Sequence, residues 1–178
     1  MEYRIRRATL EDRAALERLI AESARGLSRG DYSEAQVEAA VASVFGVDTD
    51  LIRDGTYYVA EAGGSAVGCG GWSKRRTLFG GDRFAARDSG LLDPRTEPAK
   101  IRAFFVHPGW ARRGVAGAIL ETCEREAQAQ GFRSLELMAT LPGVPFYAAR
   151  GYEAGGQVTY ETAEGVTIEF VPMRKELA

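Results

Sequence analysis

The chain has 178 residues and a formal net charge of −2, since 23 lysines and arginines face 25 aspartates and glutamates. Apolar residues make up 45% and charged residues 27%, a composition typical of globular proteins that excludes a disordered chain. The near-balanced charge disfavours nucleic acid as a partner, and no apolar run reaches the roughly 18 residues of a membrane-spanning helix.

Cysteine and histidine are scarce, which limits metal and redox chemistry. Cys69 and Cys123 are the two cysteines and His107 is the one histidine, so the sequence predicts neither a disulfide framework nor a Cys/His zinc site. The first residues are charged, unlike those of a secretory signal peptide. We expect one domain over residues 1–178 in the cytoplasm, with no metal and no contact with a membrane or nucleic acid.

The N-terminal part is predicted to hold a strand and two helices. Residues 3–8 alternate apolar side chains with arginines, as a half-buried strand does. Thr9 and Asp12 form a capping-box pattern that predicts a helix over residues 10–24. A second capping box, S-x-x-Q at residues 33–36, precedes apolar residues at helical spacing and predicts the next helix.

The pattern then changes to strands. Residues 56–62 and 66–72 are predicted to form a hairpin around the glycine pair at 63–64. A further strand is predicted at residues 100–106. Residues 73–99 form a long insertion rich in Gly, Arg and Asp, and a loop of this length is usually functional, partly structured or disordered.

The C-terminal part returns to alternation of helix and strand. An amphipathic helix is predicted to begin near Gly114 and to end before Gly131, a favourable C′ residue. A strand at 133–139, a short helix at 143–150 and a hairpin over 157–173 follow.

This order predicts an α/β fold with a mixed, mostly antiparallel sheet flanked by helices. The strand–helix–strand unit over residues 100–139 is expected to be a right-handed parallel crossover.

The residues after strand 100–106 suggest an anion site. Arg112, Arg113 and Gly114 open the predicted helix, followed by the small residues Ala116 and Gly117. Unpaired N–H groups at a helix start bind anions, and glycines allow the close approach of a phosphate. A diphosphate is the natural ligand, and the alternative is a tightly packed helix start with solvated arginines. Neither a P-loop nor a dinucleotide fingerprint is present.

A second segment, FYAARGY at residues 146–152, places Tyr147 on a short helix after strand 133–139. Together the two segments resemble the GNAT superfamily of acetyl-CoA-dependent N-acetyltransferases. That family's Q/R-x-x-G-x-G/A motif, after a strand ending V-x-P, reads here as V-H-P at 106–108 and A-R-R-G-V-A at 111–116. The element order also matches over essentially the whole chain, and the GNAT fold is what the resemblance implies.

The resemblance implies a use for each matching residue. Main-chain groups of Phe104, Phe105 and Val106 would pair with the pantetheine arm of acetyl-CoA, and the N–H near Val106 would polarise the thioester carbonyl. Tyr147 would protonate the departing thiolate. The pyrophosphate would be cradled by Arg112, Arg113, Gly114, Val115, Ala116 and Gly117. The acceptor would be a primary amine of a small molecule or peptide, and a homodimer is possible.

Three departures from the family pattern leave the mechanism incomplete. Ala111 replaces the first Gln or Arg of the motif, and the loop after strand 133–139 lacks the usual Asn. Strand 100–106 has no Glu to act as general base. The candidates that remain are ordered water and four side chains, Glu136, Glu61, Asp82 and His107, and none is assigned.

Two further interpretations concern Cys69 and the acceptor. Cys69 is either a small buried thiol, which we favour, or an acetyl-accepting nucleophile, which would need an activated thiolate. A basic and aromatic acceptor pocket is one interpretation, and it would suit a small amine that also carries a carboxylate or phosphate. Charge reversal at Arg75 and Arg76 should then raise the substrate KM without changing the affinity for acetyl-CoA. The alternative is a solvated loop with ordinary ion pairs. The expected lining of the pocket is Trp72, Lys74, Arg75, Arg76 and Tyr160.

Two other functions stay open. The chain could be a non-catalytic acyl-CoA-binding or sensing module, since the Glu and the Asn are missing. It could also be an acyltransferase of the same fold with another acyl donor or acceptor.

Overall fold

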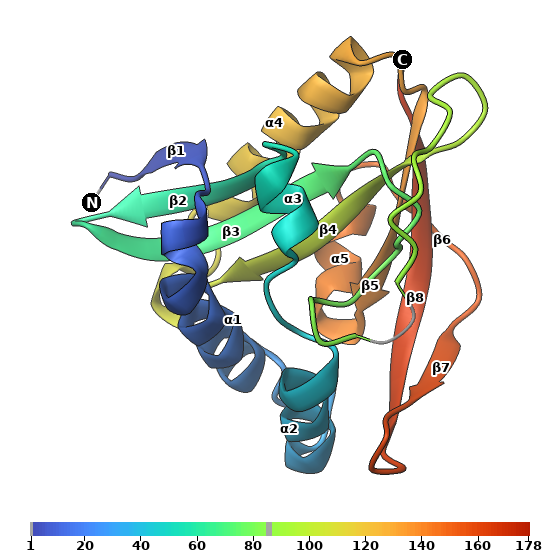
Figure 1. Cartoon of the computed structure of the whole chain (residues 1–178). Helices are drawn as coiled ribbons and strands as arrows, with labels where there is room; N and C mark the ends of the chain where they lie inside the picture. Colours follow the sequence, from blue (N-terminus) through green and yellow to red (C-terminus); the bar gives the residue numbers. More distant parts are fainter. Residues whose placement is uncertain (1, 85–86) are drawn as a thin grey trace.

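The computed structural model describes residues 2–84 and 87–178. Within them the chain forms a sheet of eight strands in the order β1-β2-β3-β4-β5-β8-β6, with β7 paired to β8 (Figure 1). The strands are β1 (Arg4–Arg7), β2 (Tyr57–Ala62), β3 (Ser65–Ser73), β4 (Ala99–Val106), β5 (Ser134–Thr140), β6 (Glu153–Ala154), β7 (Val158–Glu161) and β8 (Thr167–Glu176). The helices are α1 (Arg13–Leu27), α2 (Glu34–Ser43), α3 (Thr49–Arg53), α4 (Val115–Ala129) and α5 (Val144–Ala148), with 3-10 turns at Leu10–Asp12, Pro108–Trp110 and Leu141–Gly143.

The sheet is mostly antiparallel, and its one parallel pair joins β4 to β5. Helix α4 makes the crossover between these two strands. The predicted fold class is therefore confirmed.

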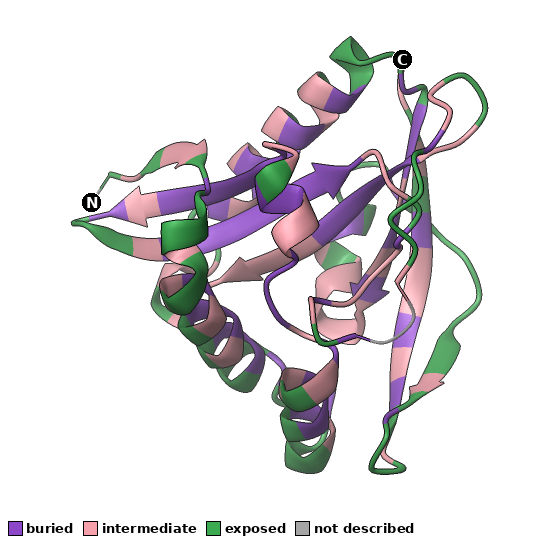
Figure 2. Cartoon of the chain, in the orientation of Figure 1, coloured by how far each residue is buried: buried purple, intermediate pink, exposed green. Residues whose placement is uncertain are grey.

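Helices cover both faces of the sheet, so the central strands are buried on both sides (Figure 2). Tyr57 and Val59 of β2 pack in the cluster that contains α1 and α3, whereas Tyr58 and Ala60 pack in the cluster that contains α4 and α5. This alternation follows from the two-residue period of a strand.

The two capping-box patterns predicted the starts of the first helical segments. The Thr9 N–H donates to Asp12 Oδ2 at 2.8 Å, and Ser33 and Gln36 exchange both bonds of their capping box. The predicted helix over 10–24 differs at its ends, because the capped turn Leu10–Asp12 is a 3-10 turn and α1 continues to Leu27.

Two short elements were not predicted. Helix α3 has five residues and is capped by Asp48, whose carboxylate accepts the Asp50 N–H at 3.0 Å. Strand β6 has two residues. Segments this short show no hydrophobic period, which is why pattern analysis missed them.

The described part of the 73–99 insertion packs against the rest of the protein. Its two arms run side by side, with the Arg76 N–H donating to Gly90 O and the Leu92 N–H to Lys74 O. Residues 85 and 86 of the insertion lie outside the described residues. Across the ranges that are described, no helix has the length and apolar character needed to cross a bilayer.

Candidate active site

The centre of the sheet is split between β4 and β5. The two strands pair only at Ala99 with Leu135 and at Lys100 with Glu136, whereas β4 continues along β3 as far as Val106. Beyond Lys100, the edge of β4 that faces β5 therefore has no partner strand. Main-chain donors and acceptors of this edge are available to an extended ligand.

The last residues of β4 show which groups face the gap. The His107 N–H donates to Val67 O on β3 at 2.9 Å, so the adjacent Val106 N–H points to the other side. There it donates to Ser23 Oγ of α1 at 3.2 Å. A bulge lies nearby, where Ala103 has a φ of 53°.

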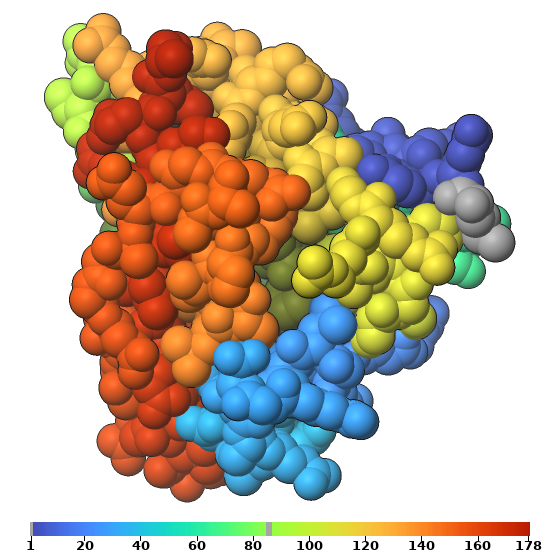
Figure 3. Space-filling model, turned by 180° about the vertical axis from the view of Figure 1, so that it is seen from behind, coloured from blue at the N-terminus to red at the C-terminus, as the bar shows by residue number. Residues whose placement is uncertain are grey.

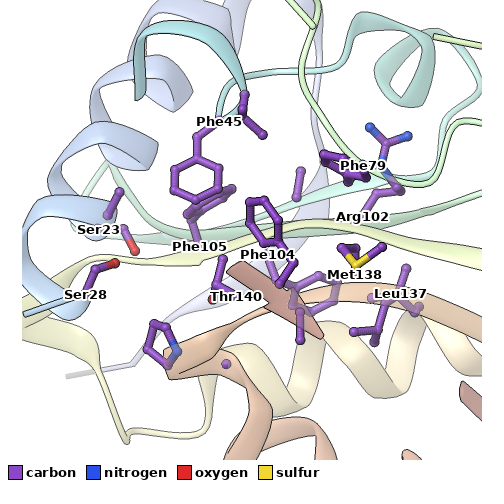
Figure 4. Close-up of a pocket in the computed structure, with 18 of the residues that line it drawn as sticks. Ser23, Ser28, Phe45, Phe79, Arg102, Phe104, Phe105, Leu137, Met138 and Thr140 are labelled. Carbon is purple, nitrogen blue, oxygen red and sulfur yellow. The ribbon is translucent and has the colours of Figure 1, made fainter. Parts of the chain in front are cut away.

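A cavity of about 250 Å³ occupies this gap. Figure 3 shows it as a hollow between α1, the loop after β4 and the segment of α5, with β4 at its floor. Figure 4 shows Phe104 and Phe105 of β4, Ser23 of α1, Ser28 directly after α1, and Thr140 of β5 around it. The cavity therefore brings Phe104, Phe105 and Val106, which were predicted to bind pantetheine, together with Ala116 and Tyr147.

The start of α4 has the character of an anion site. Gly114 takes the left-handed conformation, with a φ of 83°, and no side chain caps the helix. Arg112 and Arg113 are exposed, and the Arg113 guanidinium stacks 5.1 Å from the Trp110 ring. The first N–H groups of α4 are thus left for a ligand, with two arginines beside them.

The remaining motif residues position this helix start. The Val115 side chain is buried against Gly68, where an added Cβ would lie 2.5 Å from it. Gly117 is buried under Arg150, because a Cβ at Gly117 would lie 2.9 Å from a guanidinium nitrogen. Arg150 is thus a third arginine at this site. Sequence reasoning missed it, although it lies within the FYAARGY segment.

Tyr147 lies deep in the cavity and is 8% exposed. Its ring contacts Phe104, Phe146 and Tyr152, with centroid distances of 6.3, 5.0 and 5.7 Å. Burial raises the pKa of the Tyr147 hydroxyl, and the charge of a Cys123 thiolate would raise it further. The hydroxyl is therefore neutral at physiological pH and is able to donate a proton.

Two of the candidate bases are engaged outside the cavity. Glu136 pairs with Lys100 at the joint of β4 and β5. Glu61 accepts a hydrogen bond from Arg6 Nε at 2.6 Å, and this bond lowers its pKa. Neither carboxylate lines the cavity.

The other two candidates have structural partners. Asp82 accepts the N–H of Thr49, the first residue of α3, at 2.9 Å and pairs with Arg13 at 3.3 Å. His107 Nδ1 accepts the Gly109 N–H at 3.0 Å, and its Nε2 lies 3.4 Å from Glu22. Both residues also lie outside the cavity lining.

Cys69 is fully buried, which agrees with its interpretation as a small buried thiol. Burial raises the pKa of its thiol to about 12. A thiol held neutral in this way is a poor nucleophile. Its Sγ lies 3.9 Å from Ala103 O, so it packs behind the bulge in β4.

The residues expected to line the acceptor pocket lie outside this cavity, and the ion pairs of the insertion agree with the alternative interpretation of a loop. Trp72 is 0% exposed and belongs to the core. Arg75 pairs with Asp54 at 2.8 Å and Arg76 with Glu97 at 2.7 Å, so these cations hold the insertion in place. None of the five expected residues, Trp72, Lys74, Arg75, Arg76 and Tyr160, lines the cavity.

The insertion instead contributes Leu78, Phe79 and the glycines at 80–81 to the cavity wall. Arg102 holds this wall, because it donates to Thr77 O at 3.1 Å and to Gly80 O at 2.6 Å. Its guanidinium also pairs with Asp48 at 3.0 Å, and both side chains are 2% exposed. An arginine in the apolar run KIRAFFV was the sequence signal for a buried ion pair.

The sequence and the fold can both be compared with known proteins. A family model described as an acetyltransferase (GNAT) domain matches residues 29–177. No curated protein matches the sequence significantly.

Solved structures with a similar fold include N-acetyltransferases. A GCN5-related N-acetyltransferase from Rhodopseudomonas palustris has a TM-score of 0.74 and 23% identity, over 99% of this chain and 97% of the other. PaiA N-acetyltransferase from Thermoplasma acidophilum, solved with coenzyme A, has a TM-score of 0.64 and 15% identity over 99% of both chains. A ribosomal-protein-alanine N-acetyltransferase from Brucella melitensis has a TM-score of 0.63 and 17% identity, over 98% and 99%. With the family model spanning most of its length, this chain belongs to the GNAT acetyltransferase family.

Proposed function

We propose that this protein transfers an acetyl group from acetyl-CoA to a primary amine by direct attack in a ternary complex. The observation that carries the proposal is the unpaired edge of β4, which opens into one cavity with Tyr147. Bound acetyl-CoA would supply a thioester that is open to attack by an amine. The protein would supply binding, orientation and proton transfer.

The main chain of β4 would hold the pantetheine arm. Pantetheine contains amide groups, and the N–H and C=O groups of Phe104 and Val106 on the open edge are able to pair with them as a neighbouring strand would. The start of α4 would hold the pyrophosphate beside Arg112 and Arg113. Arg150 stands over the first turn of the same helix and would add a third positive charge.

Val106 and Tyr147 would act on the reacting atoms. The Val106 N–H would stabilise negative charge on the carbonyl oxygen, which requires Ser23 Oγ to give up its present bond. As the C–S bond breaks, Tyr147 would donate its proton to the sulfur and recover one from solvent. Its raised pKa keeps that proton available.

Binding and turnover test this proposal separately. Acetyl-CoA at ~100 times its Kd should stabilise the folded protein by about 2.7 kcal/mol in thermal unfolding. Tyr147→Phe should lower kcat about 10²- to 10⁴-fold, the usual contribution of an acid catalyst, and leave this stabilisation intact. The matched control is Tyr152→Phe, since the Tyr152 hydroxyl bonds Glu124 at 3.0 Å, and it should keep its turnover.

The second candidate is a non-catalytic acyl-CoA-binding module. It is favoured by one observation, that the described cavity lining contains no carboxylate to serve as a base. Stabilisation by acetyl-CoA with no turnover of any amine would select it. No stabilisation by acetyl-, propionyl- or succinyl-CoA would refute both functions.

A further inference from the structure

The cavity has an aromatic end away from the start of α4. We call this the acceptor end, and it is lined by residues 44–46, residues 78–81 and Phe170 of β8. Phe79 packs against Phe170 with ring centroids 5.5 Å apart, and Phe45 packs edge-on to Phe105 at 5.4 Å. Figure 4 shows Phe45 and Phe79 in the upper part of the view, with Thr140 of β5 below them. This surface suits an apolar, aromatic group.

The described lining of the cavity offers no carboxylate to a cation. Among the described residues that line the cavity, Arg102 is the one charged side chain. Its guanidinium turns toward the loop that carries Phe79, where Asp48 balances its charge (Figure 4). An ammonium group entering this cavity would lose its hydration and gain no carboxylate. Burial of that kind strongly disfavours the charged form of an amine.

We propose that the acceptor is a small aromatic amine that binds uncharged, with its ring seated among Phe45, Phe79 and Phe170. This inference rests on the proposed function and adds the class of acceptor. It disfavours polyamines, whose further ammonium groups would find no carboxylate among the described lining residues. It also disfavours amino acids, because the single arginine of the lining is already paired with Asp48.

The proton balance explains how the site works without an assigned base. An amine that enters as R–NH₂ forms the C–N bond and then loses one proton to solvent, while the sulfur takes its proton from Tyr147. An amine that stayed R–NH₃⁺ would have to shed another proton inside the cavity. The four carboxylate and imidazole candidates that could accept it lie elsewhere, as described above.

A panel of acceptors tests the inference on the unmodified protein with saturating acetyl-CoA. Aniline, benzylamine, spermidine, glycine and a short peptide are compared by thiol release at pH 7.5. The kcat/KM of the two aromatic amines should exceed that of the others by at least about tenfold, the value of one good aromatic contact. For aniline, 1/KM should be independent of pH between 7 and 9. For benzylamine it should rise about tenfold per pH unit, because an aliphatic amine with a pKa near 10 is scarcely neutral at pH 7.5.

A pair of variants at Met138 gives a second, independent test. Met138 lines the cavity from β5 and is half-buried. Met138→Glu adds a carboxylate to the cavity, and Met138→Gln is the uncharged control of the same size. The ratio of kcat/KM for spermidine to that for benzylamine should rise at least tenfold in the Glu variant relative to the Gln variant.

The outcomes separate this inference from the proposed function. Turnover that is fastest with spermidine, glycine or the peptide would overturn the aromatic acceptor and leave the acetyltransferase intact. An unchanged specificity ratio between the two Met138 variants would also overturn it. Turnover of no amine at all would refute the proposed function, and the inference would fall with it.

Discussion

The buried ion pair of Asp48 and Arg102 supports the cavity wall at residues 78–81, and its loss should lower the stability of the fold. The carboxylate lies 3.0 Å from the guanidinium, and each side chain is 2% exposed. Arg102 Nε is buried without any hydrogen-bond partner within the described structure. Asp48→Asn keeps the size of the side chain and removes its charge, so a buried guanidinium is left uncompensated. We expect a loss of about 3–5 kcal/mol in the free energy of unfolding.

Urea unfolding at pH 7 measures this loss, with Asp93→Asn as the control. Asp93 pairs with Arg95 at the surface, where the Arg95 side chain is 83% exposed, and its substitution should leave the midpoint unchanged. Adding Arg102→Met to Asp48→Asn should restore part of the stability, because the buried guanidinium is then removed as well. Arg87, which also pairs with Asp48 at 2.8 Å, keeps Asp50 as its partner. Recovery should be incomplete, since Thr77 O loses its donor.

The same variant should have a functional signature. Loosening the wall at residues 77–81 should raise the KM of the acceptor. The Kd of acetyl-CoA should stay unchanged, since Asp48 bonds Arg102, Arg87 and the Asp50 N–H and none of the residues proposed to hold the coenzyme. A stability loss below about 1 kcal/mol for Asp48→Asn would refute the reasoning, because a truly uncompensated buried charge costs more than that.

Three other predictions concern packing, pH and reactivity. Gly26→Ala should cost about 1–3 kcal/mol in urea unfolding, since its Cβ would lie 2.4 Å from the Pro108 ring; a more stable variant would contradict this close approach of α1 to the loop after β4. Arg6 hydrogen bonds lower the pKa of the Asp12 carboxyl, so its contribution is present above the ordinary carboxyl pKa and lost as pH falls through the lowered value. Stability measured from pH 6 to pH 2 should show this acid loss in the wild type and less of it in Asp12→Asn. Cys69 should resist iodoacetamide at pH 8 in the folded protein and react once urea unfolds it, as peptide mass spectrometry would show; rapid labelling of the folded protein would refute its burial.

Much of the fold could be predicted because its signals are local. The capping boxes at Thr9 and Ser33 identified helix starts, and alternation in residues 56–72 identified a hairpin. Leu135 and Leu137 flank Glu136, and this alternation indicated that the Glu136 side chain faces away from the core. In the structure that side chain pairs with Lys100. These features depend on residues that are neighbours in sequence.

The acceptor end could not be predicted, because its parts are distant in sequence. Phe45, Phe79 and Phe170 come from three segments that only the folded sheet brings together. Arg75 and Arg76 seemed available for a ligand because a sequence does not show that Asp54 and Glu97 already bind them. Charge in an insertion is therefore weak support for a substrate site until its partners are known.

The split between β4 and β5 has a consequence for the behaviour of this protein in solution. A free strand edge at a protein surface invites pairing with another chain, and proteins usually block such edges. Here the free edge lies at the bottom of a hollow, with α1 on one side and α5 on the other (Figure 3). A strand from a second protein would have to fit the side chains of both its faces between these helices, whereas a thin linear molecule would not. The hollow thus leaves an unpaired strand edge within the sheet and disfavours self-association of the chain through that edge.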